Sequence, residues 1–391
     1  MTEPLDFRIV QLHLTDQCNL RCSYCYEDRA QRSSEVMSLE TAREIAVRHL
    51  TEEGAHKRVE IDFIGGEPLL AWDVMVSLVE FVHHRKWPRD CAFTFSTNGT
   101  LFTGEMKAWL DRHSCVSFSF SLDGTREAHD LNRCNSYDRM IRHVPWALER
   151  CARMGMEKRV KMTIGADTIP MVAQGIAELH AMGFDKIDAN VPYENIWDGR
   201  LDSSLDSFAG ELDALVEYYL QRPHLEPPNL IDLPFEKIFA RKTGQEYPRW
   251  CGSGNPMICY DVQGRALPCH RFVSVSTGRG YEGPLVFPPK TWDEAGQAEP
   301  SACVGCPFVA ACPSCMALNW LENGDVDRRT HWHCGFILLQ IKASAKYKIL
   351  RLSREIDAAP QTIEGRQTVS ALQTGLDQAL FVHDLLSSQS A

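Results

Sequence analysis

The chain has 391 residues, of which 44% are hydrophobic and 24% are charged, values that are typical of a folded globular protein and argue against disorder. No apolar run reaches the ~18 residues that a membrane-spanning helix needs, and the acidic start MTEPLDFRIV lacks the regions of a signal peptide, so we expect a cytoplasmic protein with reduced cysteines and no membrane partner. The formal net charge of -11 has the wrong sign for binding phosphate backbones, which argues against nucleic acid as a partner.

The first 200 residues predict strands that alternate with helices. Six short strands are expected at residues 7–14, 58–63, 92–96, 116–121, 160–165 and 186–191. Apolar periodicity predicts helices at residues 39–50, 72–82, 137–154 with a kink at Pro145, and 171–182. This repeat favours parallel strands with right-handed crossovers, and therefore an open or closed α/β barrel. Functional groups should gather at the C-terminal ends of the strands.

The pattern changes after about residue 191. Residues 203–220 predict one more amphipathic helix, and a proline-rich connector, RPHLEPPNLIDLP, follows it. Residues 249–334 are rich in Cys, Gly and Pro, as expected of a small domain in which metal clusters take the place of a hydrophobic core. A terminal helix is expected at residues 335–352, and a loosely attached helix or tail from residue 358. We expect a barrel at 1–200, a connector at 201–248, a Cys-rich domain with its terminal helix at 249–352, and a C-terminal helix or tail at 353–391.

Fifteen cysteines in a chain expected to be reduced indicate metal or redox chemistry, and hence iron-sulfur clusters or zinc. Cys18, Cys22 and Cys25 follow the first predicted strand with C-x3-C-x2-C spacing. Three thiolates can hold three irons of a [4Fe-4S] cluster and leave the fourth iron open, as a catalytic metal centre requires. The alternatives are a zinc site with a distant fourth ligand, or chance. Single cysteines of the middle region are assigned no function, because such residues are usually small buried hydrophobes: Cys91, Cys115, Cys134 and Cys151.

The segment CNLRCSYCY resembles the signature of the radical S-adenosylmethionine (SAM) enzymes. By this resemblance, the open iron binds the amino and carboxylate groups of SAM, electron transfer cleaves SAM to a 5'-deoxyadenosyl radical, and Tyr26 is the usual aromatic residue beside the adenine. A second motif, Gly65, Gly66, Glu67 and Pro68, follows the second strand and resembles the family's motif for the SAM amino group. Glycines there let the backbone approach a ligand closely, and the carboxylate can accept from an ammonium group. Alone, GGEP would indicate only a turn.

Two further strand ends agree with this resemblance. Asn98 and Gly99 follow the third strand, and VSFSFSLDG alternates so that its serines share one face, which could line the barrel. In the family, the SLDG serine and aspartate and a later arginine contact the ribose and carboxylate of SAM. These would be Ser121, Asp123 and Arg133 here. The alternative for Arg133 is a surface salt bridge.

Eight more cysteines lie between residues 251 and 334, and seven of them resemble the signature of the SPASM domain. In radical SAM enzymes that act on peptides and proteins, this domain holds two auxiliary [4Fe-4S] clusters, so the resemblance implies three clusters per chain. By the family pattern the inner cluster is held by Cys251, Cys259, Cys269 and Cys315, and the outer one by Cys303, Cys306, Cys312 and Cys334. The chain departs from the family in placing only two residues between Cys312 and Cys315, where three are usual. A zinc ribbon built on CVGC and CPSC would leave the other four cysteines unexplained.

The SPASM group includes sulfatase-maturating enzymes, which form formylglycine, and maturases that crosslink ribosomally made peptides. In the former, an acidic general base follows the second cysteine of the first pair, whereas this chain has His270, in PCHRF. An imidazole can also take a proton near neutral pH, and PCHRF is more similar to the crosslinking maturases. The alternative, for His270 as for His331 and His333, is a hydrogen bond to a cluster sulfur.

These resemblances imply a radical SAM maturase that abstracts hydrogen from a side chain of a peptide or protein and forms a carbon-carbon or thioether crosslink. The alternatives are a formylglycine-type dehydrogenase, a small-molecule radical SAM enzyme, and, in a different class, a non-catalytic iron-sulfur electron carrier, which would need neither GGEP nor SLDG. Expected partners are the peptide or protein substrate and a reductant such as flavodoxin or ferredoxin. Only seventeen residues precede Cys18, so any leader-peptide-binding module should be absent or a separate protein.

Overall fold

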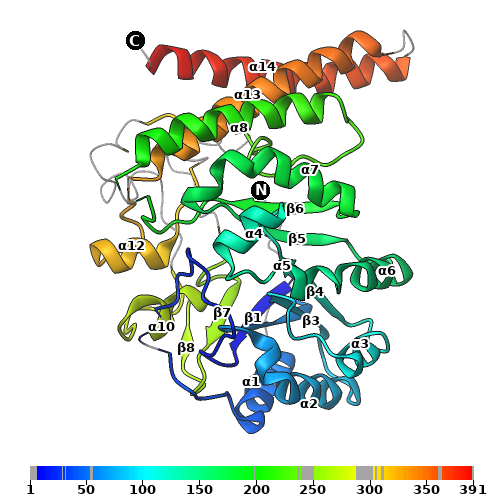
Figure 1. Cartoon of the computed structure of the whole chain (residues 1–391), viewed down its shortest axis with the longest axis vertical. Helices are drawn as coiled ribbons and strands as arrows, with labels where there is room; N and C mark the ends of the chain where they lie inside the picture. The colour runs from blue at the N-terminus through cyan, green and yellow to red at the C-terminus, as the bar shows by residue number, and fades with distance from the viewer. Residues whose placement is uncertain are drawn as a thin grey trace.

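A mainly parallel sheet organises the chain (Figure 1). The computed structural model describes residues 7–28, 30, 32–52, 56–197, 199–235, 238, 251–287, 303, 306–309, 312–330, 332–359 and 363–389. The six predicted strands are present as β1 (Phe7–His13), β2 (Arg58–Ile64), β3 (Asp90–Thr97), β4 (Val116–Ser121), β5 (Arg159–Thr163) and β6 (Lys186–Asn190). Each pairs in parallel with the next along the chain. The predicted α/β class and partial barrel are therefore confirmed.

Helices connect these strands, as the repeat predicted. They are α1 (Leu39–Thr51), α2 (Trp72–His83), α3 (Gly104–Leu110), α4 (Arg126–Asn132), α5 (Tyr137–Ile141), α6 (Val144–Met154), α7 (Val172–Met182) and α8 (Leu201–Leu220), with the 3-10 turns η2 (Pro68–Ala71) and η3 (Ala166–Met171). The prediction of one kinked helix at 137–154 is wrong, because the chain forms α5 and α6 there. Pro145 lies in the first turn of α6, where its missing N–H removes no helical hydrogen bond.

The two faces of the sheet differ in chemistry. Val10 and Leu12 of β1, like Phe93 and Phe95 of β3, are buried in the core under the helices. Residues between them in sequence point to the other face, because side chains alternate along a strand. Lys161 of β5 donates to the hydroxyl of Ser96 of β3 at 2.7 Å across that face. The face inside the barrel is therefore polar, as expected for the β4 serines.

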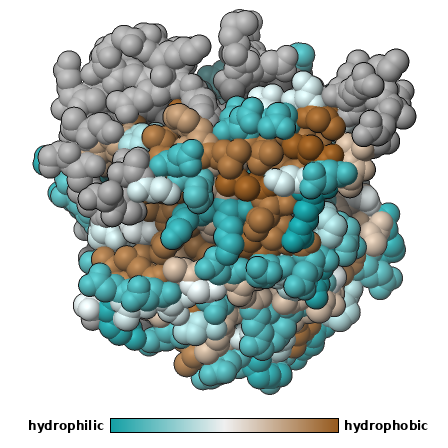
Figure 2. Space-filling view, turned by 90° about the horizontal axis from the view of Figure 1, so that it is seen from above, coloured by the Kyte–Doolittle hydropathy of each residue, from teal (hydrophilic) through white to brown (hydrophobic). Residues whose placement is uncertain are grey.

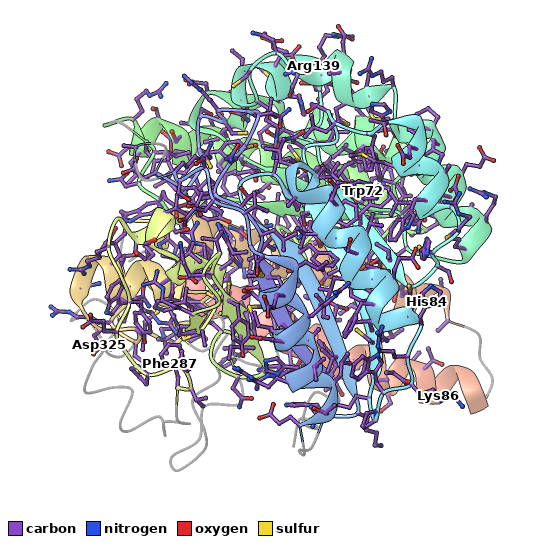
Figure 3. All side chains as sticks on the ribbon, turned by 90° about the horizontal axis from the view of Figure 1, so that it is seen from below. Trp72, His84, Lys86, Arg139, Phe287 and Asp325 are labelled. Atoms are coloured by element: carbon purple, nitrogen blue, oxygen red, sulfur yellow. The ribbon has the colours of Figure 1, made fainter. Side chains whose placement is uncertain are left out.

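The cysteine-rich region extends the sheet. Strand β7 (Met257–Tyr260) pairs in parallel with β1, and β8 (Ala266–Leu267) pairs antiparallel with β7, so the order is β6-β5-β4-β3-β2-β1-β7-β8. The short helices η4 (His270–Phe272), α10 (Ser274–Thr277) and α12 (Met316–Asn323) follow. Figure 3 shows this region, with Phe287 and Asp325, on the opposite side of the molecule from Trp72 and His84.

The expectation that clusters replace a hydrophobic core in this region is wrong. A small apolar core is formed there by Leu267, Phe272, Val273, Val275, Phe287, Met316 and Ala317, together with the buried Cys259 and Cys269. These apolar residues fall in three short stretches, at 267–275, 287 and 316–317, and show no period, which is why the sequence did not indicate a core.

Two long helices complete the chain. Helix α13 (Cys334–Ala358) packs against α8, and Phe336 and Tyr347 of α13 join the main core with Phe208 of α8. Helix α14 (Ile363–Gln389) packs on α13 through the buried Ala379 and Val382, so the expected loose tail is a docked helix. Figure 2 views the molecule from the side of these helices, where apolar and polar residues share the surface. Among the described helices, none has the length and apolar character to cross a membrane.

The loop after β4 is fixed against α7 by two glycines. Gly124 has a φ of +84°, and a Cβ added to it would lie 2.4 Å from the Cα of Gly175 in α7. Backbone therefore touches backbone at this point, which fixes the position of the preceding residue, Asp123.

Replacing Gly124 with alanine should lower the free energy of unfolding by about 2–4 kcal/mol, because the new methyl group combines an unfavourable φ with a clash against backbone. Gly210→Ala in α8 is the control, since a Cβ there meets nothing within 4 Å, and it should stabilise the helix by about 0.5–1 kcal/mol. Urea unfolding of the anaerobic proteins measures both. Equal stability of Gly124→Ala and the wild type would contradict the contact.

Candidate functional site

The first three cysteines lie on the loop after β1, at the C-terminal edge of the parallel sheet. Cys18, Cys22 and Cys25 are partly exposed, and the backbone N–H of Cys25 donates to the carbonyl of Cys22 at 3.3 Å. Burial raises the pKa of the Cys18 thiol to about 12, and the charges of Glu67 and Cys22 act in the same direction. Burial also raises the pKa of the Cys22 thiol, so a bound metal would be needed to hold Cys18 and Cys22 as thiolates.

The GGEP segment holds this loop through its backbone. Gly66 N–H donates to the Thr15 carbonyl at 2.9 Å, and Glu67 N–H donates to the Gln17 carbonyl at 2.8 Å. A Cβ on Gly65 would lie 2.4 Å from the Thr15 oxygen, and one on Gly66 would lie 2.3 Å from the Gln17 oxygen. Glycine is therefore required here for contact with the cysteine loop, whereas the sequence suggested close approach to a ligand.

Glu67 lies buried at the centre of the GGEP segment. Its Oε1 accepts from the Thr97 hydroxyl at 2.7 Å and from Leu69 N–H at 3.2 Å, and its Oε2 accepts from Asn98 N–H at 2.9 Å. Burial raises its pKa to about 7, against the effect of these hydrogen bonds. A carboxylate has about four acceptor sites, so one remains for an ammonium group. Pro68 follows as the buried first residue of η2.

The loop after β3 is hydrogen-bonded to the cysteine loop. The Asn98 side chain donates to Asn19 Oδ1 at 2.9 Å, and Asn19 in turn donates to the Thr100 hydroxyl at 2.8 Å. Asn98 Oδ1 also accepts from Thr100 N–H at 3.0 Å. The Asn98 amide, expected near SAM, therefore also positions the segment between Cys18 and Cys22.

A buried ion pair clamps the other side of the cysteine loop. Arg133 Nε and Nη2 each donate to the Asp123 carboxylate at 3.0 Å, and the side chains are 8% and 1% exposed. Asp123 also accepts from the Tyr24 hydroxyl at 2.5 Å and from Thr163 N–H at 3.1 Å. The alternative of a surface salt bridge for Arg133 is therefore wrong. Among the described residues nothing accepts from Arg133 Nη1, which is left for a ligand, and Ser121 lies partly buried two residues before Asp123.

One of the four unassigned cysteines is not buried. Cys134 is exposed, has a φ of 58°, and its sulfur accepts from the Arg21 N–H of the cysteine loop at 3.3 Å. Cys151 is buried, and Cys91 and Cys115 are partly buried. The expectation of a small buried hydrophobe is therefore wrong for Cys134.

Tyr26 and His270 connect the cysteine loop to the cysteine-rich region. The Tyr26 ring lies 5.8 Å from the His270 ring, and the Arg271 guanidinium lies 4.0 Å from the Tyr26 ring centroid. Arg271 is in turn paired with Glu194. Asp28 N–H donates to the Val275 carbonyl at 2.7 Å. Tyr26 is thus shared between the expected SAM site and the C-terminal region.

Gln11 of β1 orients His270. Gln11 Oε1 accepts from the backbone N–H of His270 at 3.0 Å and lies 3.0 Å from His270 Nδ1, while Gln11 Nε2 donates to Asp62 at 3.1 Å. Because an amide oxygen only accepts, Nδ1 carries the imidazole proton and Nε2 keeps a lone pair. Burial lowers the pKa of His270 to about 3, and the charges of His13 and Lys161 act in the same direction. The ring is therefore neutral at physiological pH.

The C-terminal cysteines form two electrostatic neighbourhoods. Burial raises the pKa of the Cys269 thiol to about 12, with Cys315 and Cys251 acting in the same direction, and Cys269 in turn acts on the fully buried Cys259. Burial likewise raises the pKa of the Cys312 thiol to about 11, with contributions from the other three cysteines expected in the outer set: Cys334, Cys303 and Cys306. Cys312 also acts on Tyr193 together with Cys315 and Cys251, so the two neighbourhoods adjoin, and the division into an inner and an outer ligand set stays a prediction.

One cavity lies between Tyr26 of the cysteine loop and the C-terminal region. It has a volume of about 620 Å³ and is lined by residues of β5, β6, β7 and α13 and of the loops beside them. Its walls include Tyr26, Lys161, Tyr193, Cys251, Cys269, His270, Arg271, Cys315, His333 and Gln340. His331 lies outside the described residues.

A comparison with protein families identifies the barrel. Residues 12–186 match the model of the Radical SAM superfamily. The chain contains a radical SAM domain. This domain implies SAM and one [4Fe-4S] cluster as cofactors, and it supports an enzyme.

Curated relatives share part of this domain. The chain is 32% identical over 143 residues to a GTP 3',8-cyclase of Haemophilus influenzae strain PittEE, which covers 36% of this chain and 41% of the relative. A GTP 3',8-cyclase of Stenotrophomonas maltophilia is 28% identical over 261 residues, or 63% of this chain and 67% of the relative. The chain thus spans about two fifths of the length of the first of these relatives.

Solved structures share the fold over a larger part of the chain. The enzyme anSMEcpe with bound AdoMet aligns with a TM-score of 0.64 and 17% identity, covering 95% of this chain and 98% of the other. SuiB of Streptococcus suis bound to the precursor peptide SuiA aligns with a TM-score of 0.54 and 14% identity. This alignment covers 84% of this chain and 75% of the SuiB chain. At these identities the likeness shows the fold.

The donor set at the end of β1 fits the cluster of a radical SAM domain. The three thiols of the motif would each hold one iron of a [4Fe-4S] cluster and would leave the fourth iron without a ligand from the motif. In the described part of the chain, no three His, Cys, Asp or Glu side chains are arranged to hold a single metal ion. A cluster does not require that arrangement, because each thiolate ligates a different iron.

Several residues that line the cavity (Lys161, Tyr193, Arg271) or support His270 beside it (Gln11, Asp62) were not predicted from the sequence. Gln11, Asp62 and Lys161 each stand between apolar neighbours in a strand, and this polar position was the available signal. Arg271 and Tyr193 had no such signal, since their place depends on the contact between the barrel and the C-terminal region.

Arg133→Ala should lower the free energy of unfolding by about 3–5 kcal/mol, because it leaves the buried Asp123 charge without its partner. The double variant Asp123→Asn, Arg133→Gln removes both charges, so its free energy of unfolding should fall clearly less than that of Arg133→Ala. Urea unfolding of the anaerobic, iron-loaded proteins measures the two. If the single variant is as stable as the wild type, the pair does not hold the cysteine loop.

Proposed function

We propose that this chain is a radical SAM maturase that abstracts hydrogen from a side chain of a ribosomally made peptide or protein and forms a crosslink. The observation that supports this is the cavity between the cysteine loop and the C-terminal region. Tyr26 from the cysteine loop, His270, and three cysteines of the proposed inner auxiliary cluster all line it. The fold likeness to anSMEcpe and to SuiB, whose structure holds a precursor peptide, favours a peptide over a small molecule.

The proposed residues divide the work as follows. Cys18, Cys22 and Cys25 would hold the catalytic cluster, and Glu67 and Arg133 would bind the amino and carboxylate groups of SAM through their remaining acceptor and donor. When bound, SAM and its cluster supply hydrogen-atom abstraction, and two auxiliary clusters supply an acceptor for the electron released on bond formation. Gln11 holds the His270 imidazole with the Nε2 lone pair available to take the proton.

We predict about twelve irons per chain after anaerobic reconstitution, from three [4Fe-4S] clusters. Replacing Cys18, Cys22 and Cys25 together with Ala should remove about one third of the iron and all reductive SAM cleavage, because the two other clusters have their own ligands. Iron analysis and detection of 5'-deoxyadenosine measure the two. About four irons in the wild type would contradict the auxiliary clusters. SAM cleavage retained in the triple variant would contradict the radical site, and its absence in the wild type would favour an electron carrier.

The second prediction concerns the product. Reduced protein with SAM and a peptide encoded beside its gene should give a peptide lighter by two hydrogens per crosslink, with fragmentation suppressed between the joined residues. His270→Ala should lower the rate of crosslink formation at least about 100-fold, as expected for loss of a general base. The variant should still transfer deuterium from a labelled peptide into 5'-deoxyadenosine. His84→Ala is the control, since that side chain is 71% exposed at the C-cap of α2.

A second candidate is a small-molecule radical SAM enzyme, favoured by the 32% identity to GTP 3',8-cyclase within the barrel. GTP would then stimulate SAM turnover and peptides would not. Conversion of a sulfatase-derived Cys peptide to an aldehyde would instead favour the formylglycine-type reaction. Either result would replace the crosslinking proposal.

A further inference from the structure

Lys161 is a cation inside the barrel that the proposed chemistry does not use. Its neighbours in β5, Val160 and Met162, are buried in the core, so Lys161 points to the opposite face. That side chain is exposed and lines the same cavity as Tyr26 and His270.

The ammonium group of Lys161 has little compensation from the protein. It donates to the Ser96 hydroxyl at 2.7 Å, which uses one of its three donors. Within the described ranges, no carboxylate lies within 4 Å of it. Its neighbours differ: Arg159, on the same face of β5, pairs with Asp188 at 2.9 Å, and Arg271 in the cavity pairs with Glu194.

The depth of Lys161 distinguishes it from the expected SAM contacts. The backbone N–H of Thr163, the last residue of β5, donates to Asp123, so the Asp123–Arg133 pair lies at the C-terminal end of β5. Lys161 lies two residues earlier, about 6–7 Å further into the barrel at ~3.3 Å per residue. The carboxylate of SAM, bound near Arg133, would therefore leave Lys161 free for the substrate.

The net charge of the chain opposes the approach of an acidic ligand. At -11, the protein repels an anionic peptide at long range, and a positive group in the cavity offsets that repulsion at close range. Burial raises the pKa of the nearby Asp62 to about 6, and the positive charge of Lys161 acts against that rise, so the charge already reaches this space.

We propose that Lys161 binds a carboxylate of the peptide substrate, an acidic side chain close to the residue that is modified. This inference rests on the proposed peptide-modifying function. Two ammonium donors remain for the carboxylate, and a charge-assisted hydrogen bond is stronger than one between neutral groups. The cavity therefore selects peptides by charge as well as by the residue attacked.

The test uses the iron-loaded protein with SAM and two synthetic probes, acetyl-Ala-Ala-Asp-Ala-Ala-amide and its Asn counterpart. Wild type and Lys346→Met, a surface control on α13, should bind the Asp probe at least about tenfold more tightly than the Asn probe. Lys161→Met should abolish that preference, Lys161→Arg should keep most of it, and SAM affinity should stay within about twofold in all four proteins.

Each contrary outcome has a distinct meaning. If the wild type binds the two probes with equal affinity, Lys161 does not bind a carboxylate of the peptide, even if peptides are modified. If Lys161→Met weakens SAM binding about tenfold, the lysine contacts SAM and the inference is wrong. If GTP binds in a Lys161-dependent manner and neither peptide binds, the anion is a phosphate, and the peptide-modifying function itself is overturned.

Discussion

The site depends on one contact between backbone segments: Gly65 and Gly66, after β2, lie against residues 15–17 of the cysteine loop. Any side chain at either glycine would overlap a carbonyl oxygen of the cysteine loop. The contact is made by hydrogen bonds that need no side chain, so the end of β2 fixes where Cys18 lies. Glu67 follows directly and reaches the end of β3. The same four residues thus position the proposed metal ligands and offer the proposed acceptor for SAM.

A buried charge pair provides the second support. Asp123 accepts from Tyr24 within the cysteine motif and from Arg133 beyond α4, while Ser23 N–H donates to the Asn132 carbonyl at 2.9 Å. Burying both charges is costly unless each is fully hydrogen-bonded, and here the geometry satisfies the carboxylate. The loop is therefore held from two sides by groups from three strand ends, before any cofactor binds.

The sequence predicted what short-range patterns determine. Alternation and turn residues predicted all six barrel strands, and apolar periodicity predicted the helix at residues 39–50, which is α1. The sequence did not predict β7 beside β1, because no local pattern records which distant segment covers a strand edge. For the same reason Gln11 was not predicted as the partner of His270, although a glutamine between Val10 and Leu12 is unusual. The sequence correctly indicated that Gly65 and Gly66 allow a close backbone approach, but what they approach is the backbone of the cysteine loop and not a ligand.

The pairing of β1 with β7 has a consequence for how the chain folds. Gln11 and His270 are 259 residues apart, so one edge of β1 finds its partner only after most of the chain has been synthesised. Until then the edge presents unpaired backbone groups, which can pair with another chain, and closing so long a loop slows folding. Slower synthesis or added chaperones should therefore reduce aggregation of chains in which β7 has not yet paired with β1.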